Sequence, residues 1–409
     1  MVSDDVRDLV RPRATGGSLE RLRIGFIPLV DCAPLVVARD LGFAVEEGLA
    51  LDLVRETSWA NIRDRIVLGH FDAAHMLAPM PLAARLGLGH MTAPVVAPWV
   101  LNQGGNSLAV SAALHAEAAD WGGLADPAAV GATLARLVAA RAARGEPPLT
   151  LASVHPFSCH EQQMRHWLAA AGVDPDVDVN LVVVPPPYMV DAMSGGAVDG
   201  ACVGAPWPSL AVEAEVGRIL LSTGAIWPST PEKVLGVREV FAERRPDALA
   251  ALLRALDRAG AWIENPENRG ALAALLARPD VVGVPEAVLM RSLSGEIRTA
   301  PNGPPVAVAD FLRFHGVGAS GPINRPRLVD GLWFAAQMLR WGQTRDRAAA
   351  FAAARAAFAP DVFDRVFGPP ATAGVEEVVP FDGSVFSAAD PQRWLDAVLA
   401  RPRPGAPTV

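Results

Sequence analysis

An alternation of strand-like and helix-like segments in the first quarter of the chain constrains the fold more than any other sequence feature. Short apolar runs typical of strands are separated by segments with helical apolar spacing, and Gly48 and Gly69 stand where helices commonly end. This order predicts parallel strands joined by crossover helices. The expected strands are 21–29, 49–55, 71–76 and 91–101, and the expected helices are 33–47, 59–68 and 81–86.

The middle third repeats this alternation as a second, smaller α/β unit, and long amphipathic helices follow after Trp207. A chain of 409 residues is long enough for two core-forming units. We therefore predict two lobes, with no internal sequence repeat. The expected boundaries are a flexible N-terminus at 1–20, the first part of lobe 1 at 21–106, lobe 2 at 107–206, the return to lobe 1 at 207–345 and a peripheral extension, helical and proline-rich, at 346–409.

Composition excludes several classes of function. The formal net charge is −8 and no basic run occurs, which argues against nucleic acid or an anionic membrane surface as the main partner. Three cysteines, Cys32, Cys159 and Cys202, are too few for a disulfide framework, and their spacings match no CxxC metal pattern.

The first twenty residues contain no apolar core of the length that a secretory signal needs, and no segment offers about 18 uninterrupted apolar residues. From this pattern we expect a soluble, cytoplasmic protein. A mis-assigned start codon that removed a signal is the alternative.

The motifs of common enzymes are missing or out of context. Gly316–Gly321 matches GxGxxG by letter, but it follows no expected strand, and Pro322 interrupts any helix after it. Cys159 and His160 could suggest a nucleophile and its base, but neighbours on one element point apart and no third group orients them. The histidines show no HExxH or i,i+4 pair for zinc. We therefore expect neither an enzyme nor a bound metal or cofactor.

Polar residues at expected loop-to-helix junctions favour anion binding instead, because helix N-termini carry free N–H groups and partial positive charge. These junctions are 58–59, 106–107, 158–160 and 229–233. Each has a simpler explanation, since Ser58 is a common helix cap and Trp59 or His160 alone is typical of a core. Lys233 is the single lysine, against 35 arginines. It either reflects composition or marks a small cavity where an arginine does not fit.

Several stretches resemble the nitrate- and bicarbonate-binding proteins of ABC transporters, and equally the soluble nitrate/nitrite sensors derived from them. The resemblance runs from about residue 22 to 343. It is carried by SWANIRDRIVLGHFDAAHMLAPMP, RHWLAAAGVDPDVDVNLVVVPPPYMVDAMSGGAVDGACVGAPW, WPSTPEKVLGV and LWFAAQMLRWGQ. It implies the type II periplasmic-binding-protein fold, with two α/β lobes, two crossovers and a ligand cleft between the lobes.

The resemblance also implies a nitrate pocket made of Trp59, Asn106, His160 and Lys233. Lys233 takes a position where the bicarbonate binders carry an acid. Nitrate has no proton to donate, so we expect its site to hold a cation and hydrogen-bond donors only. Further residues that could line the cleft are Ser58, Gly105, Tyr188, Gly204, Pro206 and Trp207.

Members of this family that serve transporters carry a secretion signal, so the chain resembles the cytoplasmic sensors more closely. From this we expect a nitrate/nitrite sensor that holds an RNA-binding antiterminator protein until ligand binding releases it. The alternatives are a substrate-binding subunit of a nitrate ABC transporter, less readily of a bicarbonate or sulfonate transporter, and a sulfonate or pyrimidine binder or an enzyme on the same fold.

Overall fold

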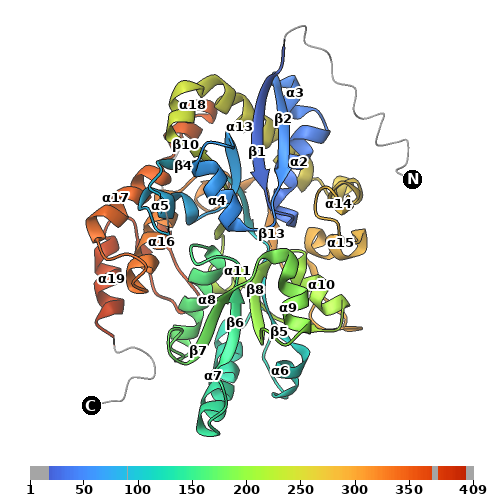
Figure 1. Ribbon diagram of the computed structural model, residues 1–409, viewed down its shortest axis with the longest axis vertical. Coiled ribbons are helices and arrows are strands. Elements are labelled where there is room, and N and C mark those ends of the chain that lie inside the picture. The colour runs from blue at the N-terminus through green and yellow to red at the C-terminus, as the bar shows by residue number, and fades with distance from the viewer. Residues whose placement is uncertain (1–17, 90, 371–375, 402–409) are drawn as a thin grey trace.

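Two α/β lobes, each built on its own sheet, make up the computed structural model, which describes residues 18–89, 91–370 and 376–401. The larger sheet has six strands in the order β13-β4-β10-β3-β1-β2, and the smaller has five in the order β7-β6-β8-β5-β9. Figure 1 shows the first sheet in the upper part of the molecule and the second, mostly green, in the lower part. The mixed α/β architecture agrees with the sequence pattern.

The sheet of lobe 1 begins with the expected parallel strands. β1 (Glu20–Phe26) pairs in parallel with β2 (Leu49–Arg55) and with β3 (Ala73–Leu77). Between β3 and β4 (Val95–Gly104) lies β10 (Pro231–Arg238), which is antiparallel to both neighbours. A strand that follows β4 by more than a hundred residues therefore occupies the centre of the sheet, and it carries Lys233.

The sheet of lobe 2 extends further along the chain than expected. β6 (Leu149–Ser153) pairs in parallel with β7 (Val179–Val183) and β8 (Gly200–Gly204). The remaining strands are antiparallel, since β5 (Asn106–Ser111) lies between β8 and β9 (Gly217–Ser222). The expected boundary at residues 206 and 207 is therefore too early, because the chain returns to the first sheet only at β10.

Two short segments connect the lobes. The first contains Gly104 and Gly105, with φ of +68° and +91°. A Cβ at Gly104 would lie 2.5 Å from the carbonyl oxygen of Phe311, and one at Gly105 would lie 2.8 Å from a methyl of Leu312. Only glycine satisfies both the backbone conformation and this packing. The second segment, residues 223–230, contains α11 (Thr223–Ile226).

The C-terminal region is part of the lobe 1 core, contrary to the expected peripheral extension. α17 (Arg347–Ala357) packs against α16 (Leu328–Arg340), and Phe358 is fully buried against Gly331 of that helix. In Figure 1, α16, α17 and α19 (Pro391–Leu399) lie side by side along one edge. The expected flexible N-terminus at 1–20 lies outside the described residues up to residue 17, and its last residue, Glu20, begins β1. Residues 371–375 and 402–409 of the expected extension also lie outside the described residues.

The other helices and strands complete the two lobes, and no helix among the described residues is long and apolar enough to cross a membrane. They are η1 Val30–Cys32, α2 Ala33–Asp40, α3 Phe43–Glu46, α4 Trp59–Val67, α5 Met80–Arg85, α6 Ala112–Ala116, α7 Pro127–Ala143, α8 Cys159–Ala170, η2 Pro186–Tyr188, α9 Met189–Ser194, α10 Trp207–Glu213, α12 Glu239–Arg244, α13 Pro246–Glu264, η3 Pro266–Asn268, α14 Arg269–Ala277, α15 Glu286–Ser294, β11 Glu296–Arg298, β12 Pro305–Ala307, β13 Leu312–Arg313, β14 Val317–Gly318, β15 Gly321–Pro322, α18 Asp361–Phe367, β16 Glu377–Val378 and β17 Phe386–Ser387.

Candidate functional site

The structure brings the four predicted pocket residues together at the boundary between the lobes. Trp59 begins α4 and Lys233 lies on β10, both in lobe 1, whereas Asn106 begins β5 and His160 lies in the first turn of α8, both in lobe 2. Trp59 is 1% exposed and the other three are fully buried. Lys233 Nζ lies 6.0 Å from the centre of the Trp59 ring.

The first turn of α8 packs directly on β10, which places His160 at the same site. The Cys159 thiol donates to the carbonyl oxygens of Pro231 and Glu232, at 3.2 and 3.5 Å. Ser158 caps the helix, with its hydroxyl oxygen accepting from the N–H of Glu161 at 3.0 Å. Burial, with the charge of Lys233 adding to it, lowers the pKa of His160 well below its usual value. The imidazole is therefore neutral at pH 7 and offers one donor and one acceptor.

Lys233 belongs to a buried chain of charged and polar groups. Its Nζ lies 2.9 Å from Asp31 Oδ2, and Asp31 Oδ1 lies 3.0 Å from His75 Nε2. Burial opposes the charge on Asp31, but Lys233 and then His75 outweigh it and lower the Asp31 pKa to about 2. Burial likewise opposes the charge on Lys233, and the neighbouring Asp31 and Glu232 raise the Lys233 pKa above its ordinary value. Asp31 and Lys233 are therefore a charged pair.

A second carboxylate, Glu232, faces the site from β10. Its Oε1 accepts from Gln163 Nε2 at 2.9 Å, and the side chain is fully buried. Burial raises the Glu232 pKa, and Lys233, Gln163 and Asn106 offset part of the rise. The expectation of a site with a cation and donors only is therefore wrong, because Asp31 and Glu232 bring two acids to it.

Sequence reasoning missed Asp31, His75 and Glu232. Asp31 follows the first strand in a local segment, VDC, that contains no recognisable motif, and His75 lies within β3. Glu232 is adjacent to Lys233, and neighbours along a regular strand face opposite sides of a sheet. The pairing of β10 with β4 shifts register between Pro231 and Lys233. At this irregularity the side chains of Glu232 and Lys233 both lie at the site. The one sequence signal for Glu232 was its position next to Lys233 in the motif PEK.

Several buried polar atoms at the site lack a hydrogen-bond partner among the described residues. They include both ring nitrogens of His160, Trp59 Nε1 and Asn106 Oδ1. The Asn106 amide nitrogen lies close enough to Glu232 to lower its pKa without forming a hydrogen bond of normal geometry. Buried polar groups are usually satisfied, and each one left unpaired costs free energy. Such a set, converging from both lobes, is what a small polar ligand would satisfy.

The other predicted cleft residues differ in their placement. The Ser58 hydroxyl oxygen accepts from the N–H of Asn61 at 3.2 Å, so this serine caps α4. A Cβ at Gly204 would lie 3.1 Å from Asn106 Oδ1 and 3.7 Å from Asp31 Oδ2, which puts this glycine at the wall of the site. Tyr188 is 52% exposed, unlike the buried site residues, so it is not part of the buried cluster, and its place in the cleft stays a prediction.

Residues near the two connections hold the lobes together beside the site. Trp207 Nε1 donates to the carbonyl oxygen of Pro28 at 3.1 Å, which ties the start of α10 to lobe 1. Pro206 precedes this helix after a cis peptide bond, and Gly105 lies between the two sheets. These residues frame the site rather than offering side-chain groups to a ligand.

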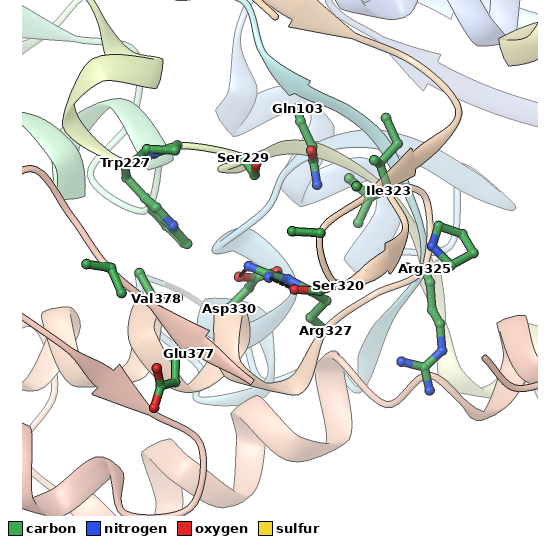
Figure 2. A pocket seen from close by; sticks show the side chains of 17 residues that line it. Gln103, Trp227, Ser229, Ser320, Ile323, Arg325, Arg327, Asp330, Glu377 and Val378 are labelled. Carbon is green, nitrogen blue, oxygen red and sulfur yellow. Dashed lines mark hydrogen bonds and ion pairs between the residues drawn. The ribbon is translucent and has the colours of Figure 1, made fainter. Parts of the chain in front are cut away.

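A separate cavity of about 230 Å³ lies behind the two connections, and none of the four pocket residues lines it. Figure 2 shows Gln103, Trp227 and Ser229 on one side of it and Arg327 and Asp330 on another. Arg327 pairs with Asp330, and Arg325 holds Asp364 through two contacts of 2.7 Å. Both arginines of this cavity are thus engaged within the protein. Gly318 and Gly321 of the GxGxxG match form the hairpin β14–β15 here, not a nucleotide-binding turn.

Comparisons with known proteins agree with the two-lobed architecture. A model described as the NMT1-like family matches residues 16–277. The crystal structure of the periplasmic nitrate-binding protein NrtA from Synechocystis superposes with a TM-score of 0.83 at 26% identity, over 93% of this chain and 98% of that one. The fold is therefore that of the type II periplasmic binding proteins.

Curated relatives include proteins named for nitrate and for bicarbonate. The chain is 36% identical over 388 residues to the nitrate import ATP-binding protein NrtC of Synechocystis, covering 93% of this chain and 56% of that protein. It is 34% identical over 397 residues to the bicarbonate transport ATP-binding protein CmpC of Synechococcus elongatus, covering 92% and 54%. The chain thus spans about half the length of these relatives.

Proposed function

Because the chain belongs to the NMT1-like family, we propose that it is the anion-binding component of an ABC import system and that its ligand is a planar oxoanion, nitrate or nitrite. The single observation that carries this proposal is the buried cluster of Trp59, Asn106, His160 and Lys233. Its polar atoms converge from both lobes, and several lack partners among the described residues.

The chemistry of the cluster suits a small planar anion. The Lys233 ammonium supplies positive charge, and the Asn106 amide and one N–H of His160 supply hydrogen-bond donors. The Trp59 indole adds a flat apolar surface and a further donor, Nε1. A tetrahedral dianion such as sulfate would bring two charges to a site that already holds Asp31 and Glu232, and we expect it to be rejected.

The same pocket would serve a sensor as well as a transport component. The relatives described above are named for import, transport and nitrate binding, so the transport function has the better support. Sensing and release of an antiterminator partner stay predictions from resemblance, and a cytoplasmic location stays a prediction from the sequence pattern.

Isothermal titration calorimetry with nitrate, nitrite, bicarbonate and sulfate on the purified chain tests this proposal. We expect heat from nitrate or nitrite and none from sulfate. His160→Ala should abolish or strongly weaken that binding. Arg258→Ala, which removes an ion pair with Glu46 and a cation–π contact with Phe43 outside the site, is the control and should bind normally. Heat from bicarbonate alone, or from none of the anions, would contradict the proposal.

A further inference from the structure

The charges at the site do not suit an anion unless one more proton is present. Asp31, Glu232 and Lys233 are 3% exposed or less. With both acids ionised their charges sum to −1, and a nitrate ion would bring the buried cluster to −2. Such an excess of like charge is expensive where water is excluded. Protonation of one carboxylate brings the charge of the occupied cluster from −2 to −1.

The two carboxylates differ in how firmly they are held as anions. Asp31 faces Lys233 Nζ at 2.9 Å and His75 Nε2 at 3.0 Å, so its charge is compensated directly. Glu232 has one neutral donor, Gln163 Nε2, at 2.9 Å, and its Oε2 accepts no hydrogen bond from any described residue. Glu232 is therefore the carboxylate that accepts a proton at lower cost.

The groups around Glu232 support this assignment. Lys233 on β10 and Asp31 on η1 form their own pair, and Cys159 on α8 and Cys202 on β8 are buried thiols with pKa values raised well above normal. The neighbouring side chains from lobe 2, Gln163 and Asn106, are uncharged amides. Burial raises the Glu232 pKa and lowers that of His160, so burial favours a proton on the carboxylate and disfavours one on the imidazole.

We propose that the site binds its anion together with one proton, and that Glu232 carries this proton in the complex. The step is a proton transfer from solvent to Glu232 Oε2, whose new O–H donates to an oxygen of the anion, and no bond of the anion breaks. A ligand that brings its own O–H, such as bicarbonate, would instead donate to the ionised carboxylate. The inference rests on the proposed function and deepens it. It makes the protonation state of Glu232 decide whether the site takes a ligand without a proton or a ligand that carries its own O–H.

Calorimetry of nitrate binding from pH 6 to pH 9 tests the inference, because nitrate itself does not titrate there. Each pH is measured in two buffers with different enthalpies of ionisation, and the difference in heat counts the protons taken up. We expect uptake that approaches one proton at the alkaline end. The dissociation constant should then rise by up to about tenfold per pH unit.

Glu232→Gln keeps the shape of the side chain, provides a permanent N–H donor and carries no charge. We expect this variant to bind nitrate without proton uptake and with an affinity that is flat across the pH range. Glu376→Gln removes a carboxylate that accepts from the N–H of Val329 outside the site, and it should keep the wild-type pH dependence. The two-buffer measurement on the wild-type protein decides the proton count even if Glu232→Gln does not fold.

Two outcomes would overturn the inference while leaving the proposed function intact. One is nitrate binding with no proton uptake across the pH range. The other is uptake that persists in Glu232→Gln, which would assign the proton to a histidine. Failure of nitrate to bind at any pH would overturn the proposed function and the inference together.

Discussion

At the scale of single residues, the site is a buried ion pair surrounded by unsatisfied polar groups. The resemblance singled out Trp59, Asn106, His160 and Lys233, and the structure brings these four side chains together. Asp31 and Glu232 were missed, because which carboxylates meet the lysine depends on strand pairing across the sheet and not on local spacing. The ligand-binding role of all these residues stays a prediction.

The Lys233 ammonium should determine anion affinity through both its charge and its size. Lys233→Ala removes a charge-assisted hydrogen bond worth about 1.5–3 kcal/mol, and we expect nitrate affinity to fall about 10- to 100-fold. Lys233→Arg should also weaken binding, because the position is fully buried and a broad guanidinium needs more room than an ammonium. Titration calorimetry on both variants is the measurement, with thermal unfolding to confirm that they fold. Wild-type affinity in Lys233→Arg would show that the lone lysine reflects composition alone.

At the scale of helices and strands, local patterns predicted much of the fold and long-range pairing accounts for the rest. The parallel strands β1 to β3 and the helices α4 and α5 lie within a few residues of their expected positions. The insertion of β10 between β3 and β4 has no local signal, since sheet neighbours distant in sequence are set by tertiary contacts. The late return to lobe 1 and the packing of α17 into the core were missed for the same reason.

The first connection between the lobes should tolerate no side chain at Gly104. Alanine there would combine a φ of +68° with a contact of 2.5 Å to the Phe311 carbonyl oxygen. Gly42 is a matched control, with a φ of +80° and open space around the added Cβ. We expect Gly42→Ala to lower the free energy of unfolding by about 1 kcal/mol and Gly104→Ala by about 3 kcal/mol. Urea denaturation measures both, and equal losses would mean that the contact with Phe311 is easily relieved.

At the scale of the whole molecule, the site lies where the two lobes meet. Each lobe contributes about half of the polar groups of the site. Lobe 1 contributes Asp31, Trp59, Glu232 and Lys233, and lobe 2 contributes Asn106, His160 and Gln163. A ligand that contacts Trp59 and Lys233 from one lobe and Asn106 and His160 from the other would stabilise the arrangement in which the lobes are closed. The composition and the alternation of elements predicted two lobes, but the closure over a buried charged pair follows only from the three-dimensional structure.

The central claim is that a nitrate-class anion occupies this site, and a crystal structure of the protein with nitrate tests it most directly. We predict planar density beside the Trp59 ring, with oxygens within hydrogen-bond distance of Lys233 Nζ, the Asn106 amide and a ring nitrogen of His160. Soaking with sulfate at the same concentration is the control and should leave this density absent. The claim would be contradicted if nitrate were found only in the cavity between Gln103 and Arg327, or if no nitrate were found at the site between the lobes.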